Sequence, residues 1–342
     1  MDLSFLGLYK DIGVDLGTAT TLICVKGRGI TLCEPSVVAI DRYTKKVLAV
    51  GNEANEMLGR TPENITALCP VKDGVIADFE TTAAMLKAYI RRAAGKSPLI
   101  KPRVAVAVPC GITDVERRAV TEVMLAAGAR SALLIEEPMA AGLGAGLPVC
   151  AAQGTMVVNI GAGTCEAAVM SLGGIVSARS IRGAGTAVDN AIISYIRREY
   201  SITIGAKTAE EIKIEIGSAS PYADEGYYEV RGRESATGLP KNVRVAASEI
   251  RAAMGEALAV IVDAVIDTLE DTPPELAADV LASGITVTGG GAMLRNIDTV
   301  IESATGIHTV IAENPAQCVC AGTGAALSNP VIIRRSEVAR RR

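Results

Sequence analysis

The chain has very few aromatic residues. Its 342 residues include no tryptophan, two phenylalanines and one histidine, although 49% of them are hydrophobic. The core must therefore be built from alanine, valine, isoleucine and leucine, as in α/β proteins with buried sheets. The formal net charge is −4 and basic residues concentrate only in the tail, at 334–335 and 340–342. This balance gives no support to nucleic-acid binding.

Membrane-spanning stretches and paired-cysteine motifs are also missing. No apolar run approaches the roughly 20 residues that a membrane helix needs, and the N-terminus lacks the basic start of a signal peptide. None of the eight cysteines forms a CxxC pair, so we expect reduced thiols in a cytosolic protein. Cys318, Cys320 and His308 permit a metal site, but small buried residues explain the two cysteines better.

Two common phosphate-binding signatures are missing as well. The sequence has no GxxxxGK[ST] motif and no GxGxxG motif that opens a helix, which argues against P-loop and dinucleotide-binding folds. Residues 156–172 (MVVNIGAGTCEAAVMSL) instead form an apolar strand, a glycine-rich turn and a second apolar strand. The amide groups of such a turn point outward, and proteins use them to hold polyphosphates.

A stretch near the N-terminus repeats this pattern. Residues 12–18 (IGVDLGT) also lead from an apolar strand through a glycine turn into a second apolar run. Asp15 matches Asn159, and Thr18 matches Thr164, which indicates two related halves. Two such hairpins facing each other would clamp the phosphates of a nucleotide between two lobes.

Strands alternate with helices along the chain, which predicts parallel or mixed sheets covered by helices. We expect Thr113 and Thr208 to begin helices with capping boxes, with Val115 on the apolar face of the first. A third glycine turn, Gly289–Gly291, follows a predicted strand and strengthens the case for a nucleotide, while 142–148 indicates a crossing between domains. The other predicted strands are 30–32, 37–40, 47–50, 104–108, 132–135, 227–232, 242–246 and 284–288, and the other predicted helices are 54–58, 78–93, 189–200, 248–269 and one that 322–325 opens.

Several short stretches resemble the MreB/Mbl family of bacterial actins. The same motifs occur more weakly in the wider superfamily of actins, heat-shock chaperones and sugar kinases. The resemblance extends over nearly the whole chain and is specific because it combines many motifs. These are GVDLGTA at 13–19, EPSVVA at 34–39, VKDGVIADF at 71–79, IEEPMAA at 135–141, EIKIEIGSA at 211–219, TPPELAAD at 272–279 and TGGGA at 288–292.

This resemblance implies the actin-like, ribonuclease H-like α/β fold. Two lobes, each with a mixed five-stranded sheet and helices, would enclose a cleft for ATP and Mg²⁺. The first lobe is expected over 1–145, with a small inserted sub-domain at 33–70. The second lobe is expected over 146–320, with a sub-domain at 182–246. Residues 321–342 would form a helix that returns to the first lobe, followed by the basic tail.

The resemblance also implies roles for residues of the cleft. Glu137, with Glu136 beside it, matches the residue that orients or polarises the attacking water, and strand ends of this kind are where α/β folds bind ligands. Asp15 and Asn159 would hold a hydrated magnesium ion. Two turns would wrap the phosphates: Asp15, Gly17, Thr18, Ala19 and Thr20 in the first, and Gly161, Ala162, Gly163 and Thr164 in the second. The ribose and adenine would be reached by Glu210, Glu211, Ile212 and Lys213. The adenosine would lie against Gly289, Gly290, Gly291, Ala292 and Met293.

The second phosphate loop departs from the family pattern DIGGGTTE. Asn159 stands in place of an acid that helps to hold magnesium, and Ala162 adds a methyl group where the backbone approaches phosphate. Cys165, the third candidate for catalysis, replaces a hydroxyl expected to help orient water. Thr20 replaces the usual Asn, and residues 186–189 also differ from the family. Together these changes predict weak magnesium coordination and at most slow ATP hydrolysis, with nucleotide binding kept.

The family resemblance implies a cytoskeletal protein that polymerises on ATP, lies on the inner face of the cell membrane and organises cell-wall synthesis with the elongation machinery. A soluble ATP-dependent chaperone or reactivase and a small-molecule kinase are the alternatives on this fold. The sequence lacks an evident substrate-binding domain and an evident acceptor-site base beyond the glutamate pair, which disfavours both. Membrane contact is expected from Leu3, Phe5, Leu6 and Leu8, which equally suit an edge strand or a disordered tip, and from Leu99 and Ile100 at a loop tip, which equally suit an inward tuck.

Overall fold

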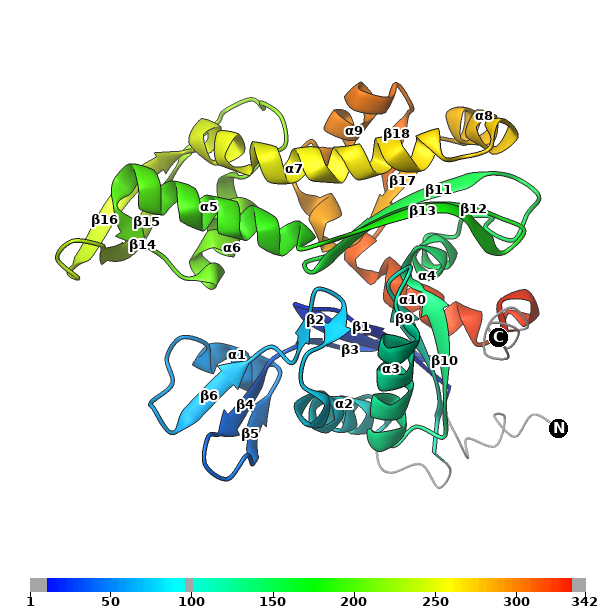
Figure 1. Ribbon diagram of the computed structural model, residues 1–342, viewed down its shortest axis with the longest axis horizontal. Coiled ribbons are helices and arrows are strands. Elements are labelled where there is room, and N and C mark those ends of the chain that lie inside the picture. The colour runs from blue at the N-terminus through cyan, green and yellow to red at the C-terminus, as the bar shows by residue number, and fades with distance from the viewer. Residues whose placement is uncertain (1–10, 96–100, 334–342) are drawn as a thin grey trace.

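Two five-stranded sheets organise the computed structural model, which describes residues 11–95 and 101–333 (Figure 1). Their strand orders are β10-β9-β1-β2-β3 and β13-β12-β11-β17-β18. Both sheets join three antiparallel strands to two parallel ones, so the predicted pair of mixed five-stranded sheets is confirmed. The strands are β1 Ile12–Leu16, β2 Thr20–Val25, β3 Gly29–Pro35, β9 Arg103–Val108, β10 Ser131–Glu136, β11 Thr155–Ile160, β12 Thr164–Ser171, β13 Gly174–Arg182, β17 Ile285–Thr288 and β18 Thr309–Ile311.

The first lobe, from β1 to β10, packs its sheet against two helices. α2 (Phe79–Ala94) begins at Asp78, which caps it, and buries the predicted apolar face. α3 (Asp114–Ala126) begins with the predicted capping box between Thr113 and Glu116. Aliphatic residues and a single buried tyrosine fill the space between the sheet and these two helices, as the composition predicts. The largest are Ile12, Ile23, Met85, Leu86, Tyr89 and Met124.

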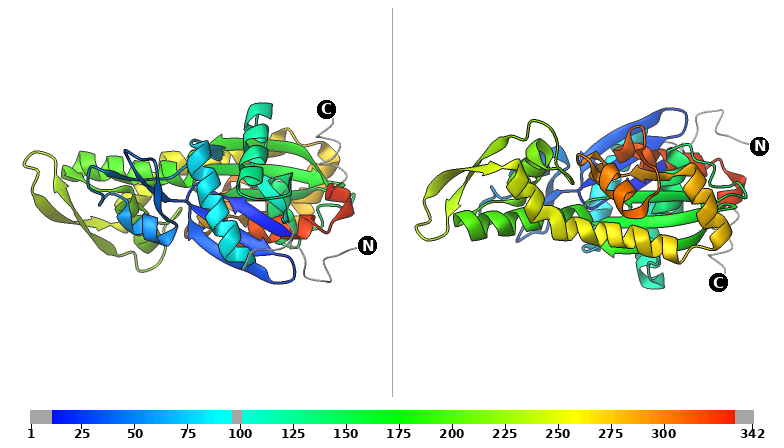
Figure 2. Two further views of the ribbon diagram at one scale, coloured as in Figure 1. Left: turned by 90° about the horizontal axis from the view of Figure 1, so that it is seen from below. Right: turned by 90° about the horizontal axis from the view of Figure 1, so that it is seen from above.

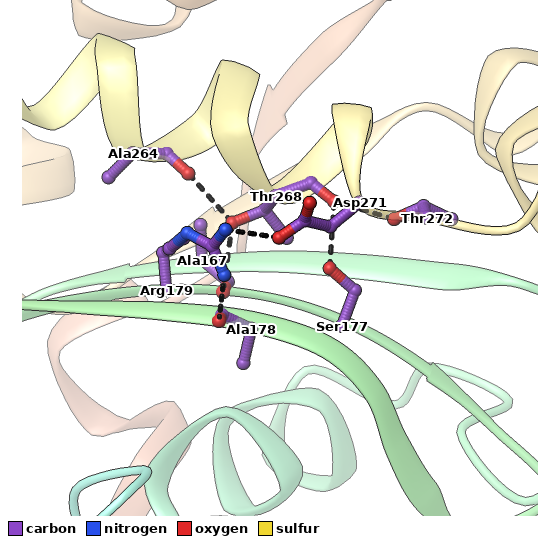
Figure 3. A network of polar contacts seen from close by, with 8 residues as sticks. All are labelled: Ala167, Ser177, Ala178, Arg179, Ala264, Thr268, Asp271 and Thr272. Atoms are coloured by element: carbon purple, nitrogen blue, oxygen red, sulfur yellow. Dashed lines mark hydrogen bonds and ion pairs between the residues drawn. The ribbon is translucent and has the colours of Figure 1, made fainter.

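The second lobe, from β11 to β18, packs its sheet against α5 (Ala184–Tyr200) and α7 (Ala247–Glu270). Figure 2 shows α7 running along much of the length of this lobe. Its C-terminal end is fastened to the sheet, because Ser177 donates a hydrogen bond to the Thr268 carbonyl at 2.8 Å and Arg179 forms an ion pair with Asp271 (Figure 3). The remaining helices of this lobe are α6 Ala206–Ile216, α8 Pro274–Ser283 and α9 Ile297–Thr305.

A small three-stranded sheet extends from each lobe. Figure 1 places both at the left-hand end of the molecule, one below the other. The first contains β5-β4-β6 with α1, and the second contains β14-β15-β16. A two-stranded ribbon, β7-β8, leads from the first small sheet to α2. The bounds are β4 Val38–Asp41, β5 Val47–Val50, α1 Asn52–Met57, β6 Ile65–Leu68, β7 Val71–Lys72, β8 Val75–Ile76, β14 Ile202–Thr203, β15 Tyr227–Glu234 and β16 Pro240–Ala246.

Helices α4 (Glu137–Gly144) and α10 (Cys318–Ala326) cross between the two large sheets (Figure 1). Their backbones touch at glycines: a Cβ added to Gly144 would lie 1.8 Å from the Cys318 carbonyl oxygen, and one added to Gly322 would lie 1.7 Å from that of Ala140. No real Cβ tolerates such distances, so only glycine permits this crossing. None of the helices in the two described ranges is long and apolar enough to cross a membrane.

Three predicted helix starts are wrong. α6 begins at Ala206 behind an extended Gly205 that offers no side-chain cap, so Thr208 lies inside the helix and forms no capping box. α10 begins at Cys318, so Gly322 lies inside that helix rather than opening it. α5 begins at Ala184, ahead of the predicted start at 189, and follows a left-handed Gly183. None of these three helices begins at a side-chain cap, so the local capping signal did not set their starts.

One further local prediction needs correction. Val115 does not lie on the apolar face of α3, since it is 77% exposed. The expected domain crossing at 142–148 includes the end of α4, which continues to Gly144. Several elements were not predicted, among them β13, α8, α9 and β18, although α9 buries Ile297 and Ile301 on one face. Cys318 and Cys320 are buried, and among the described residues no group of three or more His, Cys, Asp or Glu side chains is placed to hold a metal ion.

Candidate functional site

The β1–β2 and β11–β12 hairpins face each other and meet at their tips. A Cβ added to Gly163 would lie 2.1 Å from Thr18 Oγ1 and 2.9 Å from the Asp73 Cα. The Gly74 amide donates a hydrogen bond to Thr18 Oγ1 at 3.3 Å, and a Cβ on Gly74 would lie 3.0 Å from Thr164 Cγ2. The turn between β7 and β8 therefore lies at the junction of the two hairpins. The sequence predicts the hairpins but does not single out this turn.

Both hairpins close with four-residue turns, 17–20 and 161–164. This common register contradicts the predicted match of Thr18 with Thr164, because Thr20 occupies the position equivalent to Thr164. The sequence comparison aligned the two glycine-threonine pairs and so shifted one turn by two residues. The paired strands, in contrast, fix the register over five or six rungs.

Hydrogen bonds turn the carbonyl groups of the second turn away from the junction. The amides of Gly183, Gly185 and Thr186 donate to the carbonyls of Gly163, Gly161 and Ala162 at 2.6, 3.1 and 2.8 Å. In the described part of the chain the amides of Ala162 and Gly163 donate to no acceptor. Such unpaired, outward-facing amides are what a phosphate requires.

Ser36 fixes the first turn in the same way, although the sequence did not single it out as a site residue. Its amide donates to the Ala19 carbonyl at 2.8 Å, and its hydroxyl donates to the Gly17 carbonyl at 2.6 Å. Thr21 also contacts this hydroxyl at 2.8 Å. The motif EPSVVA, which contains Ser36, was the available signal.

Glu137 lies at the start of α4, where both second-hairpin strands reach it. Asn159 Nδ2 donates to Glu137 Oε2 at 3.2 Å, and Thr164 Oγ1 lies 3.5 Å from the same oxygen. Thr288 donates to Asn159 Oδ1 at 3.1 Å and thereby fixes which end of the amide faces the glutamate. The Thr164 hydroxyl and the Asn159 amide both contact the same oxygen of Glu137. Contacts within the protein therefore define the orientation of this carboxylate.

Burial shifts the titration of the two acids of the site. Burial, together with the nearby charge of Glu137, raises the pKa of Asp15 to about 8. Burial also raises the pKa of Glu137, against the hydrogen bonds from Thr164 and Asn159, which lower it. Two acids with raised pKa values in one place favour a cation between them. They fit a magnesium ion that keeps most of its waters and is held by one or two carboxylates and a substrate phosphate.

Comparisons with known proteins decide the family. The family described as MreB/Mbl protein matches residues 9–335. The cell shape-determining protein MreB of Escherichia coli K12 is 53% identical over 329 residues, which are 94% of this chain and 95% of that protein. The cell shape-determining protein Mbl of Bacillus cereus is 50% identical over 320 residues, which are 94% and 96% of the two chains.

The chain belongs to the MreB/Mbl family. Its fold agrees with this membership. The crystal structure of MreB5 of Spiroplasma citri bound to AMPPNP superimposes with a TM-score of 0.89 at 39% identity, covering 97% of this chain and 99% of that one. The predicted actin-like fold is therefore confirmed.

Cys165 differs in its surroundings from the other MreB/Mbl site candidates. Its side chain is fully buried in the aliphatic core of the second lobe, with Val158, Ile160 and Val188 in the same cluster. Successive residues of a strand face opposite sides of the sheet, so Thr164 faces Glu137 while Cys165 faces the core. This placement gives no support to a role for the thiol in orienting water. Glu136 is half-buried at the end of β10.

The candidates for the adenosine end lie on two neighbouring segments. Arg295, just after the Gly289–Met293 loop, donates to the Gly217 carbonyl at 3.2 Å, and the Ala219 amide donates to the Arg295 carbonyl at 2.8 Å. These bonds join the end of α6 to the glycine loop. Lys213 forms an ion pair with Asp189 at 2.7 Å. Glu210, Glu211, Gly290 and Met293 are exposed, whereas Ile212 and Ala292 are buried.

The residues expected to contact a membrane lie outside the described part of the chain. This applies to Leu3, Phe5, Leu6 and Leu8 near the N-terminus and to Leu99 and Ile100 in the loop between α2 and β9.

Proposed function

We propose that this protein is a bacterial actin-like cytoskeletal protein that binds ATP with Mg²⁺ between its two hairpins. It polymerises into filaments on the inner face of the cell membrane and guides the cell-wall elongation machinery to set cell shape. The observation that carries the proposal is the meeting of two equivalent glycine turns, the second beside the Glu137 carboxylate, in a chain of the MreB/Mbl family. The family gives no support to the chaperone alternative.

A nucleoside triphosphate suits this place for physical reasons. The second turn offers free amides, while its carbonyls are occupied by α5. The related MreB5 of Spiroplasma citri was solved bound to AMPPNP, an ATP analogue. Thr18 and Thr20 of the first turn and Thr164 of the second would complete the contacts to phosphate, while the α6 and Gly289–Met293 segments would hold the nucleoside.

Glu137 is the residue that we assign to positioning the attacking water. Its Oε2 accepts hydrogen bonds from the protein, and its raised pKa makes it a better proton acceptor than an exposed carboxylate. The magnesium ion would neutralise phosphate charge when bound. Asn159 cannot supply the negative charge of a second carboxylate. We therefore propose that hydrolysis is slow and that nucleotide binding is retained.

Membrane attachment completes the proposal. The apolar residues at 3–8 and the loop residues Leu99 and Ile100 are the candidate contacts, and burial of such side chains at a bilayer surface is favourable. The protein would then be cytoplasmic and peripheral on the membrane.

Sedimentation of the full-length protein tests the proposal. With Mg²⁺ and ATP the protein should pellet as filaments, and without nucleotide it should stay in the supernatant. Liposomes with anionic lipid should carry it into the pellet. Deletion of residues 2–9 combined with Leu99→Ser and Ile100→Ser should abolish liposome pelleting and leave ATP-dependent pelleting intact. A protein that neither binds ATP nor pellets with it would refute the function, and unchanged liposome pelleting would remove only the membrane claim.

A further inference from the structure

The segment that joins β9 to α3 in the first lobe is attached to the second lobe at two points. Glu166 of β12 accepts a hydrogen bond from the Cys110 amide at 2.7 Å through its Oε1. Arg182 of β13 forms an ion pair with Glu116, at 3.2 Å between Nη2 and Oε1. We call these two contacts the interlobe clasp.

The two attachment points lie two rungs apart on the second-lobe sheet, with the Cys165–Ile181 pair between them. Glu166 pairs with Ser180 across the strands, and Thr164 pairs with Arg182. The Ser180 hydroxyl also donates to Glu166 Oε1, at 2.9 Å. Thr164 is the residue whose hydroxyl lies beside Glu137. The clasp is therefore built onto the same strand pair that carries the second phosphate turn.

The two contacts differ in burial. Glu166 is fully buried, and its second carboxylate oxygen has no hydrogen-bond partner. A buried polar atom without a partner costs free energy, so a contact retained at such a cost is not incidental packing. The Arg182 side chain is 65% exposed, and an exposed ion pair contributes little. Glu166 therefore provides the main attachment and Arg182 a weaker one.

On the first-lobe side the clasp holds the beginning of a helix. Glu116 uses its other oxygen, Oε2, to accept hydrogen bonds from the amide and the hydroxyl of Thr113, both at 2.8 Å. This closes the capping box of α3. A displacement of Arg182 therefore acts on the first turn of α3, and a displacement of Glu166 acts on the loop before it.

We propose that Glu166 and Arg182 are positioning residues that hold the β9–α3 segment on the second lobe and so set the separation of the two phosphate hairpins. Opening the cleft to admit or release a nucleotide requires both contacts to break. This inference rests on the proposed nucleotide site, but both contacts of the clasp lie within the protein and can be measured on the protein alone.

Two measurements on the full-length protein test the clasp. The first is hydrogen exchange of the Cys110 amide in nucleotide-free protein, read in a short peptide across residues 107–113. The second is the dissociation rate of a fluorescent ATP analogue. Glu166→Ala should accelerate both by about tenfold, which corresponds to about 1.4 kcal/mol. Arg182→Ala should accelerate them about two- to threefold, as for an exposed ion pair.

Two further variants separate the clasp from general destabilisation. Glu166→Gln keeps an acceptor oxygen for the Cys110 amide and should restore slow exchange, even if Glu166→Ala folds poorly. Arg179→Ala removes an arginine from the same strand whose partner, Asp271, lies within the second lobe (Figure 3). It should leave both rates unchanged.

The outcomes separate a failure of the clasp from a failure of the proposed nucleotide-binding function. Unchanged Cys110 exchange in both Glu166→Ala and Arg182→Ala would overturn the clasp. Faster exchange with unchanged nucleotide dissociation would overturn its positioning role. A wild-type protein that binds no nucleotide would instead refute the proposed function, while the exchange result would stand.

Discussion

The two hairpins share a backbone register but differ in two side chains that decide what each can do. In the first hairpin, Asp15 pairs with Leu22 across the strands. At the equivalent position of the second hairpin, Asn159 pairs with Glu166. Leu22 packs in a small apolar cluster with Cys24 and Cys320 of α10. Glu166 instead reaches the other lobe through the Cys110 amide.

This difference indicates a division of labour between equivalent structures. The first hairpin presents its carboxylate at the cleft and has an apolar cross-strand partner beside it. The second presents an amide at the cleft, and its carboxylate serves the contact between the lobes. A repeated backbone element thus provides two turns for phosphate, while single side chains assign charge to one side and attachment to the other.

A substitution at Gly163, where the two hairpins come closest, should have the largest effect on ATP binding. Gly163→Ala places a methyl group against Thr18 and the Asp73 backbone, so the hairpins must separate. We expect ATP affinity to fall by at least about tenfold, the effect of losing about 1.4 kcal/mol of binding free energy. Gly255→Ala is a matched control, since no atom lies within 4 Å of its added Cβ. Equal affinities of the two variants, measured by titration, would contradict the close contact.

Making the second hairpin resemble the first should have the next largest effect. Asn159→Asp removes the donor to Glu137 and places two carboxylates together, so unfolding free energy in EDTA should fall by about 1–3 kcal/mol. With Mg²⁺ and ATP the loss should shrink and turnover should rise, because the new carboxylate can help to hold the cation. Asn242→Asp, on an exposed strand position, controls for the added charge.

The thermal unfolding of these variants with and without Mg²⁺, together with phosphate release, provides the test. ATP turnover by the unaltered protein as fast as is usual in the family would refute the slow-hydrolysis hypothesis. A loss of stability in Asn159→Asp that Mg²⁺ and ATP do not reduce would refute the proposed cation position.

Cys165→Thr alone should have the smallest effect. The side chain faces an aliphatic core, so an added hydroxyl should cost about 1 kcal/mol of stability or less after it bonds to the backbone. Turnover should stay within about twofold of wild type, a change of roughly 0.4 kcal/mol. A large rise in phosphate release from this variant alone would show that residue 165 acts on the reaction after all.

Local sequence patterns predicted the hairpins and mixed sheets covered by helices, whereas the expectation of two five-stranded sheets came from the family resemblance. Apolar runs and glycine turns identified β1–β2 and β11–β12, and the capping box at Thr113 placed the start of α3 correctly. The match of Thr18 with Thr164 failed, because strand pairing, not the order of residue types, sets the register.

The contacts between lobes could not be predicted in the same way. Glu166 is the only charged residue of β12, which was a signal, but its partner is a backbone amide that carries no sequence information. The start of α10 likewise depends on a tertiary contact, since Gly322 lies against the Ala140 carbonyl. Pairings between segments far apart in the chain require the fold before they can be recognised.

The glycine crossing of α4 and α10 limits how the molecule can deform. With backbone against backbone at Gly144 and Gly322, translation of one helix along the other meets steric overlap at once. Rotation about the crossing point moves nearby atoms least and distant atoms most. A rotation of a few degrees about this helix crossing would produce the largest displacements at the outer ends of the lobes, where β4–β6 and β14–β16 lie (Figure 1).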